Sequence, residues 1–240
     1  DTLIEEPDRP ALGKLFQQLE FRRLSAQMLG EPEDNDQQLG GLFGGPAVST
    51  SQADKPAVEK LFKDIDSIEH DYIKVDELAE MKKLAADLLD QKIICFDTET
   101  TSINANDAEL VGIAFAYEKG KAYYVPVPSD PKESAAIVDI FRPVLEHSGI
   151  AKTAHNYKYD AIVMRRHGVA LRGPVRDTLI AHYLLNPDLR HKMDYLAETI
   201  LNYKPIPIEK LIGKGKNQLS MRDISIDKVV PYASEDADIT

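Results

Sequence analysis

The apolar residues of the chain follow different patterns in three regions. In residues 1–30, apolar positions recur at helical spacing after Pro10, which predicts a helix. Residues 31–57 are rich in Gly, Pro, Ser, Asp and Gln, a composition typical of a flexible linker. From residue 58 onward the pattern is regular, and it predicts a folded domain over residues 58–240.

Within this domain, short apolar runs alternate with amphipathic stretches. The runs predict strands over residues 70–75, 92–99 and 150–156, and two more over 109–127, joined by a turn at Lys119–Gly120. The amphipathic stretches predict helices over 76–91, 133–147, 157–167, 178–185, 193–203 and from about 227 onward. This alternation indicates an α/β domain with a mixed central sheet flanked by helices.

Two helix starts are predicted from capping residues. Asp76 is the expected N-cap of the helix over 76–91. Asp227 is the expected N-cap of the last helix, which places Pro231 near the end of its first turn. A proline costs little there, because the first backbone donors of a helix have no partner within it.

Two acidic residues follow an apolar run in the segment FDTETT, residues 96–101. Side chains of a strand alternate between its faces, so Asp97 and Glu99 point the same way and lie a few ångströms apart. Two neighbouring carboxylates repel each other. Either water screens the pair at the end of the strand, or a cation lies between the two acids.

Two further segments carry acids at the ends of predicted elements. Asp160 lies in HNYKYDAIV on the helix over 157–167, and Tyr232 and Asp236 lie four apart on the last helix, so they share one face. Glu235 and Asp238 point elsewhere on that helix. Taken singly, each acid is typical of a solvated turn, a helix cap or a wet helix face.

Taken together, four carboxylates at the ends of neighbouring elements predict a single site, since functional groups gather at strand ends in α/β folds. Oxygen ligands without His or Cys favour Mg²⁺ or Mn²⁺. Two such ions a few ångströms apart catalyse phosphodiester cleavage, one by activating the attacking water and one by stabilising the leaving oxygen.

The net charge of −11 counts against nucleic-acid binding, which normally depends on Lys and Arg. Divalent cations would neutralise the clustered acids, and a local basic segment would provide contacts to phosphates. Such a segment is KLIGKGKNQLSMR, with Lys210, Lys214, Lys216 and Arg222.

Other features bear on the location of the protein. The single cysteine, Cys95, lies in the strand over 92–99 and is interpreted as a small buried hydrophobe. No stretch reaches the apolar length of a membrane span, and no basic-then-apolar leader opens the sequence. We therefore expect a cytoplasmic protein with no membrane partner.

Five segments occur in the order and spacing of a known family: FDTETTSINANDAELVGIAFA, HNYKYDAIVMRRHGV, DTLIAHYLLNP, GKGKNQLS and YASEDADIT. They resemble the 3′→5′ proofreading exonuclease domain of bacterial DNA polymerase I, a member of the DEDD exonuclease superfamily. The resemblance covers about residues 68–240 and implies a ribonuclease H-like fold. The spacing of Tyr232 and Asp236 is similar to that of the tyrosine subtype.

The resemblance implies a role for each acid. Asp97 would bridge two divalent metal ions, either Mg²⁺ or Mn²⁺, and Glu99 and Asp236 would complete the shell of the first ion. Asp160 would serve the second ion, and Tyr232 would hold the attacking water by its hydroxyl.

The resemblance also implies contacts to DNA. Ile103 falls at the position of an apolar wedge against the terminal bases, although ordinary loop packing explains it equally well. Asn156, Tyr159 and Arg190 fall where the family contacts the frayed strand. Two alternatives remain: Tyr159 could be a tyrosine of the core, and Arg190 could lie in a solvated segment that leads into a helix. Ile208 stands where the family often has an aromatic residue, which implies weaker stacking of the penultimate base.

The implied partners are a single-stranded or frayed DNA 3′ end and the other domains of a polymerase. Residues 1–30 resemble the end of the 5′-nuclease region, and a polymerase domain would follow residue 240. The chain is expected to be a monomeric, nucleoid-associated part of a bacterial polymerase. Two alternatives remain open: an RNA 3′ exonuclease similar to ribonuclease D, and a non-catalytic spacer domain.

Overall fold

The computed structural model describes residues 8–18, 25, 29, 62–215 and 218–240, which belong to two units, 1–62 and 63–240. In the first unit, helix α1 (Arg9–Gln18) lies within the helix predicted for residues 1–30. Asp8 precedes it and accepts a hydrogen bond from the Ala11 backbone at 3.1 Å. The linker predicted over residues 31–57 lies outside the described residues.

The second unit is built on a mixed sheet of six strands in the order β1-β4-β3-β2-β5-β6. The central pairs β2–β3 and β3–β4 are antiparallel, whereas β1–β4, β2–β5 and β5–β6 are parallel. The strands are β1 (Asp71–Lys74), β2 (Ile93–Thr100), β3 (Leu110–Glu118), β4 (Lys121–Pro126), β5 (Ala151–Ala154) and β6 (Val175–Asp177). The predicted α/β class with a mixed sheet is confirmed.

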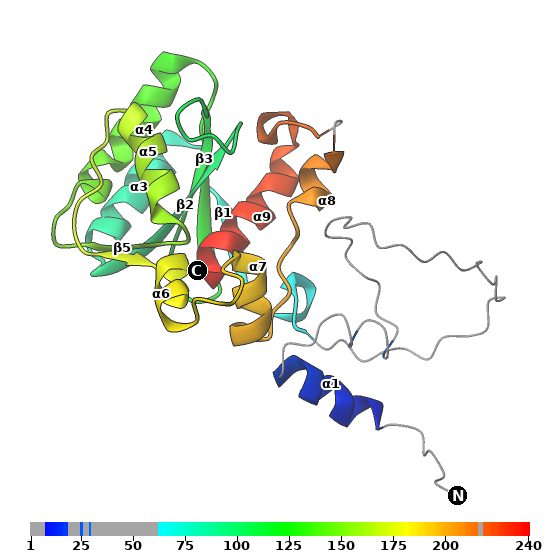
Figure 1. Ribbon diagram of the computed structural model, residues 1–240. Helices are drawn as coiled ribbons and strands as arrows, with labels where there is room; N and C mark the ends of the chain where they lie inside the picture. Colours follow the sequence, from blue (N-terminus) through cyan, green and yellow to red (C-terminus); the bar gives the residue numbers. More distant parts are fainter. Residues whose placement is uncertain (1–7, 19–24, 26–28, 30–61, 216–217) are drawn as a thin grey trace, which may run out of the picture. The chain divides into compact units, whose positions relative to one another are not determined.

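Helices cover both faces of this sheet (Figure 1). They are α3 (Leu78–Leu89), α4 (Pro131–Leu145), α5 (Tyr157–Arg166), α6 (Thr178–Leu185), α7 (Met193–Leu196), α8 (Glu209–Ile212) and α9 (Ile226–Ile239). The apolar faces of α3, α4 and α5 form one core with alternate residues of the strands. Helix α9 packs on the opposite face through small residues, among them Ala233 and Ala237.

The predicted hairpin between β3 and β4 is present, with its turn at Gly120. Gly120 has φ +76°, a conformation that residues with a Cβ rarely adopt. Residues 110–116 of β3 are all buried, as expected for a central strand covered on both faces. This core fixes the position of β2, which carries the first two acids.

Both predicted helix caps are wrong. Helix α3 begins after Glu77, and Asp76 instead pairs with Lys74 at 2.6 Å. Helix α9 begins after Ser225, so Pro231 lies beyond its first turn and removes an internal hydrogen bond. The helix nevertheless continues to Ile239 and packs on the sheet through Val229, Ala233 and Ala237.

Three other segments differ from the expectations. The helix predicted over 193–203 consists of α7 followed by a π-helical turn (Ala197–Leu201). Strand β6 and helix α8 were not predicted, because each is only three or four residues long. Short 3₁₀ turns occur at Ile65–Ser67 and Met221–Asp223. Among the described residues, no helix has the length and apolar character needed to cross a membrane.

Candidate active site

The end of β2 carries the two acids on the face that α9 covers. Along this strand Phe96 faces the α3–α5 core, whereas Cys95 packs toward α9. Alternation therefore directs Asp97 and Glu99 toward α9 as well. A register irregularity follows Glu99 in the pairing with β3, so the regular ladder ends where the acids lie.

Helix α9 brings a third carboxylate to this point. One oxygen each from Asp97, Glu99 and Asp236 lies within 4.8 Å of the others. Glu99 is buried, and the other two are half-buried. Three carboxylates packed this closely repel one another unless protons or cations neutralise them. Their all-oxygen donor set is the kind that hard divalent cations such as Mg²⁺ bind.

The electrostatic strain of this carboxylate cluster is visible in its pKa values. Burial raises the pKa of Asp97 to about 6. The pKa of Glu99 is raised well above its usual range by burial and by the charges of Asp97 and Asp160. Burial and the charge of Asp97 are also the main causes of the raised pKa of Asp236. Strongly perturbed carboxylates in one place are typical of a functional site.

Asp160 reaches the cluster from the other face of the sheet. It lies on α5 and is 2% exposed, and its Oδ1 accepts hydrogen bonds from the backbone N–H and the hydroxyl of Thr98. Strand β5 pairs with β2 only as far as Cys95, which leaves the Thr98 N–H open on that side. The pKa of Asp160 is raised by burial and then by the charge of Asp97. The structure thus groups three of the four predicted acids and places the fourth beside Asp97.

Tyr232 lies one turn before Asp236 on α9 and is directed to the same acids. Its pKa is raised by burial and by the charges of Asp236, Glu99 and Asp97. A tyrosine in this setting remains protonated at any physiological pH. Its hydroxyl is therefore available as a hydrogen-bond donor beside the carboxylate cluster.

Two neighbouring acids of α9, Glu235 and Asp238, turn away from the cluster, as predicted. Glu235 accepts hydrogen bonds from Tyr203 and Ile206, and Asp238 accepts from Tyr72 and Gly120. Only Asp236 of these three faces β2.

A family model described as 3′-5′ exonuclease matches residues 72–240 of this chain. The chain belongs to the 3′-5′ exonuclease domain family of DNA polymerase I. The DNA polymerase I of Pseudomonas aeruginosa is 34% identical over 98% of this chain, which spans 24% of that relative's length. That of Borreliella burgdorferi is 33% identical over 74% of the chain, or 20% of the relative.

Solved structures support the fold of this exonuclease domain. The catalytic core of RRP6 from Trypanosoma brucei has a TM-score of 0.56 at 18% identity, covering 75% of this chain and 46% of that one. NrnC from Brucella melitensis with bound Mg²⁺ has a TM-score of 0.51 at 18% identity, covering 71% and 76%. At this identity the likeness concerns the fold, which is the predicted ribonuclease H-like one.

Ile103 lies at the tip of the loop that follows β2 in the exonuclease domain. It is 98% exposed, so the alternative of ordinary loop packing is wrong. The loop beneath it is closed by a pair of hydrogen bonds at 3.0 Å, Thr101 N–H to the Glu109 carbonyl and Glu109 N–H to the Thr101 hydroxyl. An apolar side chain is thus presented to solvent on a fixed base.

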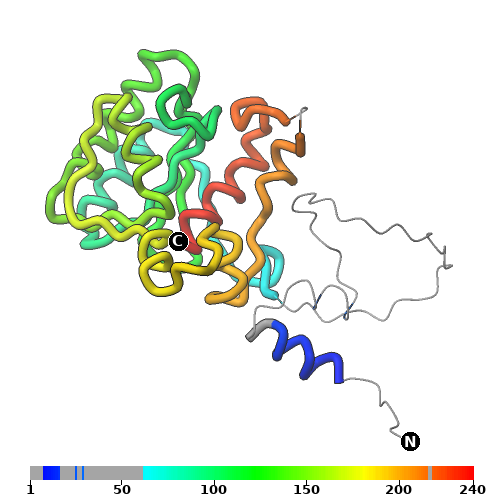
Figure 2. The backbone as a smooth tube through the Cα atoms, in the orientation of Figure 1, coloured from blue at the N-terminus to red at the C-terminus, as the bar shows by residue number. Residues whose placement is uncertain are grey.

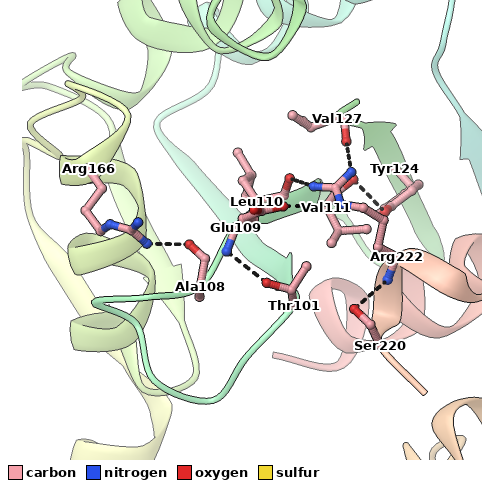
Figure 3. A network of polar contacts seen from close by, with 10 residues as sticks. All are labelled: Thr101, Ala108, Glu109, Leu110, Val111, Tyr124, Val127, Arg166, Ser220 and Arg222. Atoms are coloured by element: carbon pink, nitrogen blue, oxygen red, sulfur yellow. Dashed lines mark hydrogen bonds and ion pairs between the residues drawn. The ribbon is translucent and has the colours of Figure 1, made fainter. Parts of the chain in front are cut away.

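Two arginines brace this loop from opposite sides (Figure 3). Arg166 of α5 donates to the Ala108 carbonyl. Arg222 donates to the carbonyls of Leu110 and Val127 at 2.7 and 3.1 Å. Arg222 is therefore engaged inside the domain, whereas the sequence grouped it with the basic segment. In the sequence, Arg222 follows Ser220 and Met221, and nothing in this context indicates that it binds backbone carbonyls inside the domain.

The other predicted DNA contacts lie in different structural settings. The Tyr159 hydroxyl hydrogen bonds with Ser102 and Thr100 at the base of the Ile103 loop. Asn156 is the N-cap residue of α5, in the left-handed conformation with φ 68°. Arg190 is exposed in the loop between α6 and α7, and Ile208 is 39% exposed before α8.

Thr98 is the residue of this site that the sequence reasoning missed. It lies between two acids and is only 7% exposed. The sequence did contain a signal for this role. Strand alternation directs the Thr98 side chain into the core, where a hydroxyl group is unusual. Such a group needs a buried partner, and here the partner is Asp160.

Proposed function

We propose that this exonuclease domain removes 3′-terminal deoxynucleotides from single-stranded or mismatched DNA ends. The observation that carries the proposal is the grouping of Asp97, Glu99 and Asp236 within 4.8 Å. In this proposal Glu99 and Asp236 would hold one divalent cation, Asp160 would hold a second, and Asp97 would contribute to both. When bound, such ions activate water and stabilise the leaving oxygen.

The protein groups around this centre have separate tasks. Tyr232, kept protonated by its surroundings, orients the attacking water through its hydroxyl. Thr98 holds Asp160 toward Asp97 through two hydrogen bonds. We propose that Ile103 packs against the terminal bases and that Asn156, Tyr159 and Arg190 contact the frayed strand.

We further propose that the domain works within a DNA polymerase I. The relatives are about four times longer than the chain, which spans 24% of the Pseudomonas aeruginosa protein. Residues 1–30 would be the end of a 5′-nuclease region, residues 31–57 a linker, and residues 58–240 the nuclease domain. A polymerase domain would supply the DNA end that this site trims.

The test is the shortening of a 5′-labelled single-stranded oligodeoxynucleotide with Mg²⁺ or Mn²⁺ added. We expect a ladder of products that shorten from the 3′ end, and none with Asp97→Ala or with chelator. A mismatched duplex end should be trimmed faster than a matched one, because unpairing costs a few kcal/mol and least for a mismatch.

Two results would redirect the proposal. Preference for an RNA oligonucleotide of the same sequence would indicate an RNA 3′ exonuclease. Absence of cleavage, together with absence of metal binding by calorimetry, would indicate a spacer domain.

A further inference from the structure

Helix α9 is held by two buried or half-buried carboxylates that do not belong to the acidic cluster. Glu235 is fully buried, and its two oxygens accept hydrogen bonds from the Tyr203 hydroxyl at 2.5 Å and from the Ile206 N–H at 2.6 Å. Asp238 accepts from the Tyr72 hydroxyl at 2.9 Å and from the Gly120 N–H at 2.7 Å. Each carboxylate thus joins the helix to a separate segment.

These attachments determine how the helix is rotated about its axis. With 3.6 residues per turn, Asp236 points about 100° away from Glu235 and about 160° away from Asp238. The hydrogen bonds of Glu235 and Asp238 therefore attach the helix on sides other than the one that carries Asp236. A small rotation would move Asp236 relative to Asp97 and Glu99, which lie on a different element.

Tyr203 is suited to be the fixed end of one anchor. It is 5% exposed, and its backbone N–H donates to the Ala197 carbonyl at 3.0 Å. The residues beside it pair with Lys63: Lys63 N–H donates to Asn202 at 3.1 Å, and Lys204 N–H donates to Lys63 at 2.8 Å. The segment that carries Tyr203 runs beside α9 (Figure 2).

We propose that Tyr203 and Glu235 form a positioning pair that aims Asp236 at the metal site. The proposal rests on the proposed function, since it concerns how that site is assembled. Neither residue belongs to the acidic cluster. They act through α9, because Glu235 directly precedes Asp236 and its hydrogen bonds fix the turn that carries it.

The main test is Tyr203→Phe, which removes one hydroxyl and no packing volume. The Glu235 oxygen loses its partner, and we expect Mn²⁺ binding, measured by titration calorimetry, to weaken by roughly tenfold, as for the loss of a hydrogen bond to a metal-holding group. Excess Mn²⁺ should restore most of the cleavage rate. The control is Tyr117→Phe, which removes the hydroxyl bond between a half-buried tyrosine and Tyr123 on the α3–α5 face. It should leave Mn²⁺ binding unchanged.

Glu235→Gln separates geometry from charge. A glutamine oxygen can accept from Ile206 while its amide donates to Tyr203, so both contacts remain and we expect binding within about threefold of the wild type. The proposal would be overturned if Tyr203→Phe lowered the melting temperature without changing Mn²⁺ binding. It would also be overturned if Tyr203→Phe and Tyr117→Phe bound Mn²⁺ equally well, or if Glu235→Gln weakened Mn²⁺ binding more than Tyr203→Phe. A wild type that binds no Mn²⁺ would instead refute the proposed function.

Discussion

Asp160 is bound to Thr98 through one oxygen, which accepts the Thr98 hydroxyl at 2.6 Å and the Thr98 N–H at 3.1 Å. Thr98 lies between Asp97 and Glu99 on β2. The Asp160 carboxylate of α5 is therefore joined to the strand that carries two of the other three acids, and it reaches them from the opposite face of the sheet. This contact gives a direct way to test how Asp160 is placed.

Thr98→Val keeps the shape of the side chain and removes only the hydroxyl bond. Because both groups are buried, we expect the free energy of unfolding to fall by about 1–3 kcal/mol and cleavage to slow. Thr98→Ser retains the hydroxyl and serves as the control. Urea unfolding and oligonucleotide cleavage at pH 8 measure both effects, and equal stability of the Val variant and the wild type would contradict the assigned bond.

The stability of the metal-free domain should decrease as the pH rises. Burial raises the pKa of Asp97 from 3.8 to about 6, and burial also raises the pKa values of Glu99, Asp160 and Asp236. Between the usual and the raised values, the folded state keeps protons that the unfolded state has lost, so the slope of stability with pH is negative. Melting in chelator should therefore give a lower temperature at pH 8 than at pH 5.5.

Substitution and metal provide the two controls for this pH dependence. Asp97→Asn removes one repelling charge, so it should flatten the slope and stabilise the metal-free protein at pH 8, while abolishing cleavage. Mg²⁺ or Mn²⁺ replaces the protons, so its stabilising effect should be larger at pH 8 than at pH 5.5. A metal-free domain that is most stable at pH 8 would refute the assigned pKa directions.

Tyr232 and Asp236 share a helix face, but substitutions of the two residues should have different effects on metal binding and cleavage. Asp236→Ala removes a charged metal ligand, and we expect weaker Mn²⁺ binding and a loss of several kcal/mol of transition-state stabilisation. Tyr232→Phe removes one neutral hydrogen bond, so cleavage should slow by roughly tenfold, with ~1.4 kcal/mol per decade of rate. Titration calorimetry should show little change for Tyr232→Phe. The reverse ranking would place the metal on a different face of α9.

Ile103 should affect substrate choice without affecting stability. Since it is 98% exposed, Ile103→Ala loses no packing and should keep the wild-type melting temperature. If half of the side chain is covered by a terminal base, the variant loses about 1 kcal/mol, or roughly fivefold in kcat/KM on duplex ends. Leu78→Ala, on the exposed side of α3, is the control. Wild-type kcat/KM for Ile103→Ala on both duplex and single-stranded ends would exclude the wedge.

The sequence predicted the elements whose patterns are strong. The helix over 178–185 has the predicted bounds, and β2 differs from its prediction by one residue at each end. The predictions for these segments are accurate because burial determines the spacing of their apolar residues. Strand alternation alone places Asp97 and Glu99 on one face. Helical geometry alone predicts that Glu235 and Asp238 point away from the face of Asp236.

What the sequence left open depends on contacts between distant segments. Asp76 has the residue type of a cap, yet an ion pair with Lys74 competes for its carboxylate. The roles of Arg222 and Thr98 rest on partners 62 or more positions away. Local propensity contains no term for such partners, so these roles emerge only once the sheet order is known.

The sheet order also has a consequence for biosynthesis. The acidic cluster combines residues of an early strand with Asp236, near the end of the last helix. A nascent chain that has not yet reached α9 contains all six strands of the sheet but only two of the three grouped carboxylates. We therefore expect no nuclease activity during translation until α9 has left the ribosome and packed on the sheet.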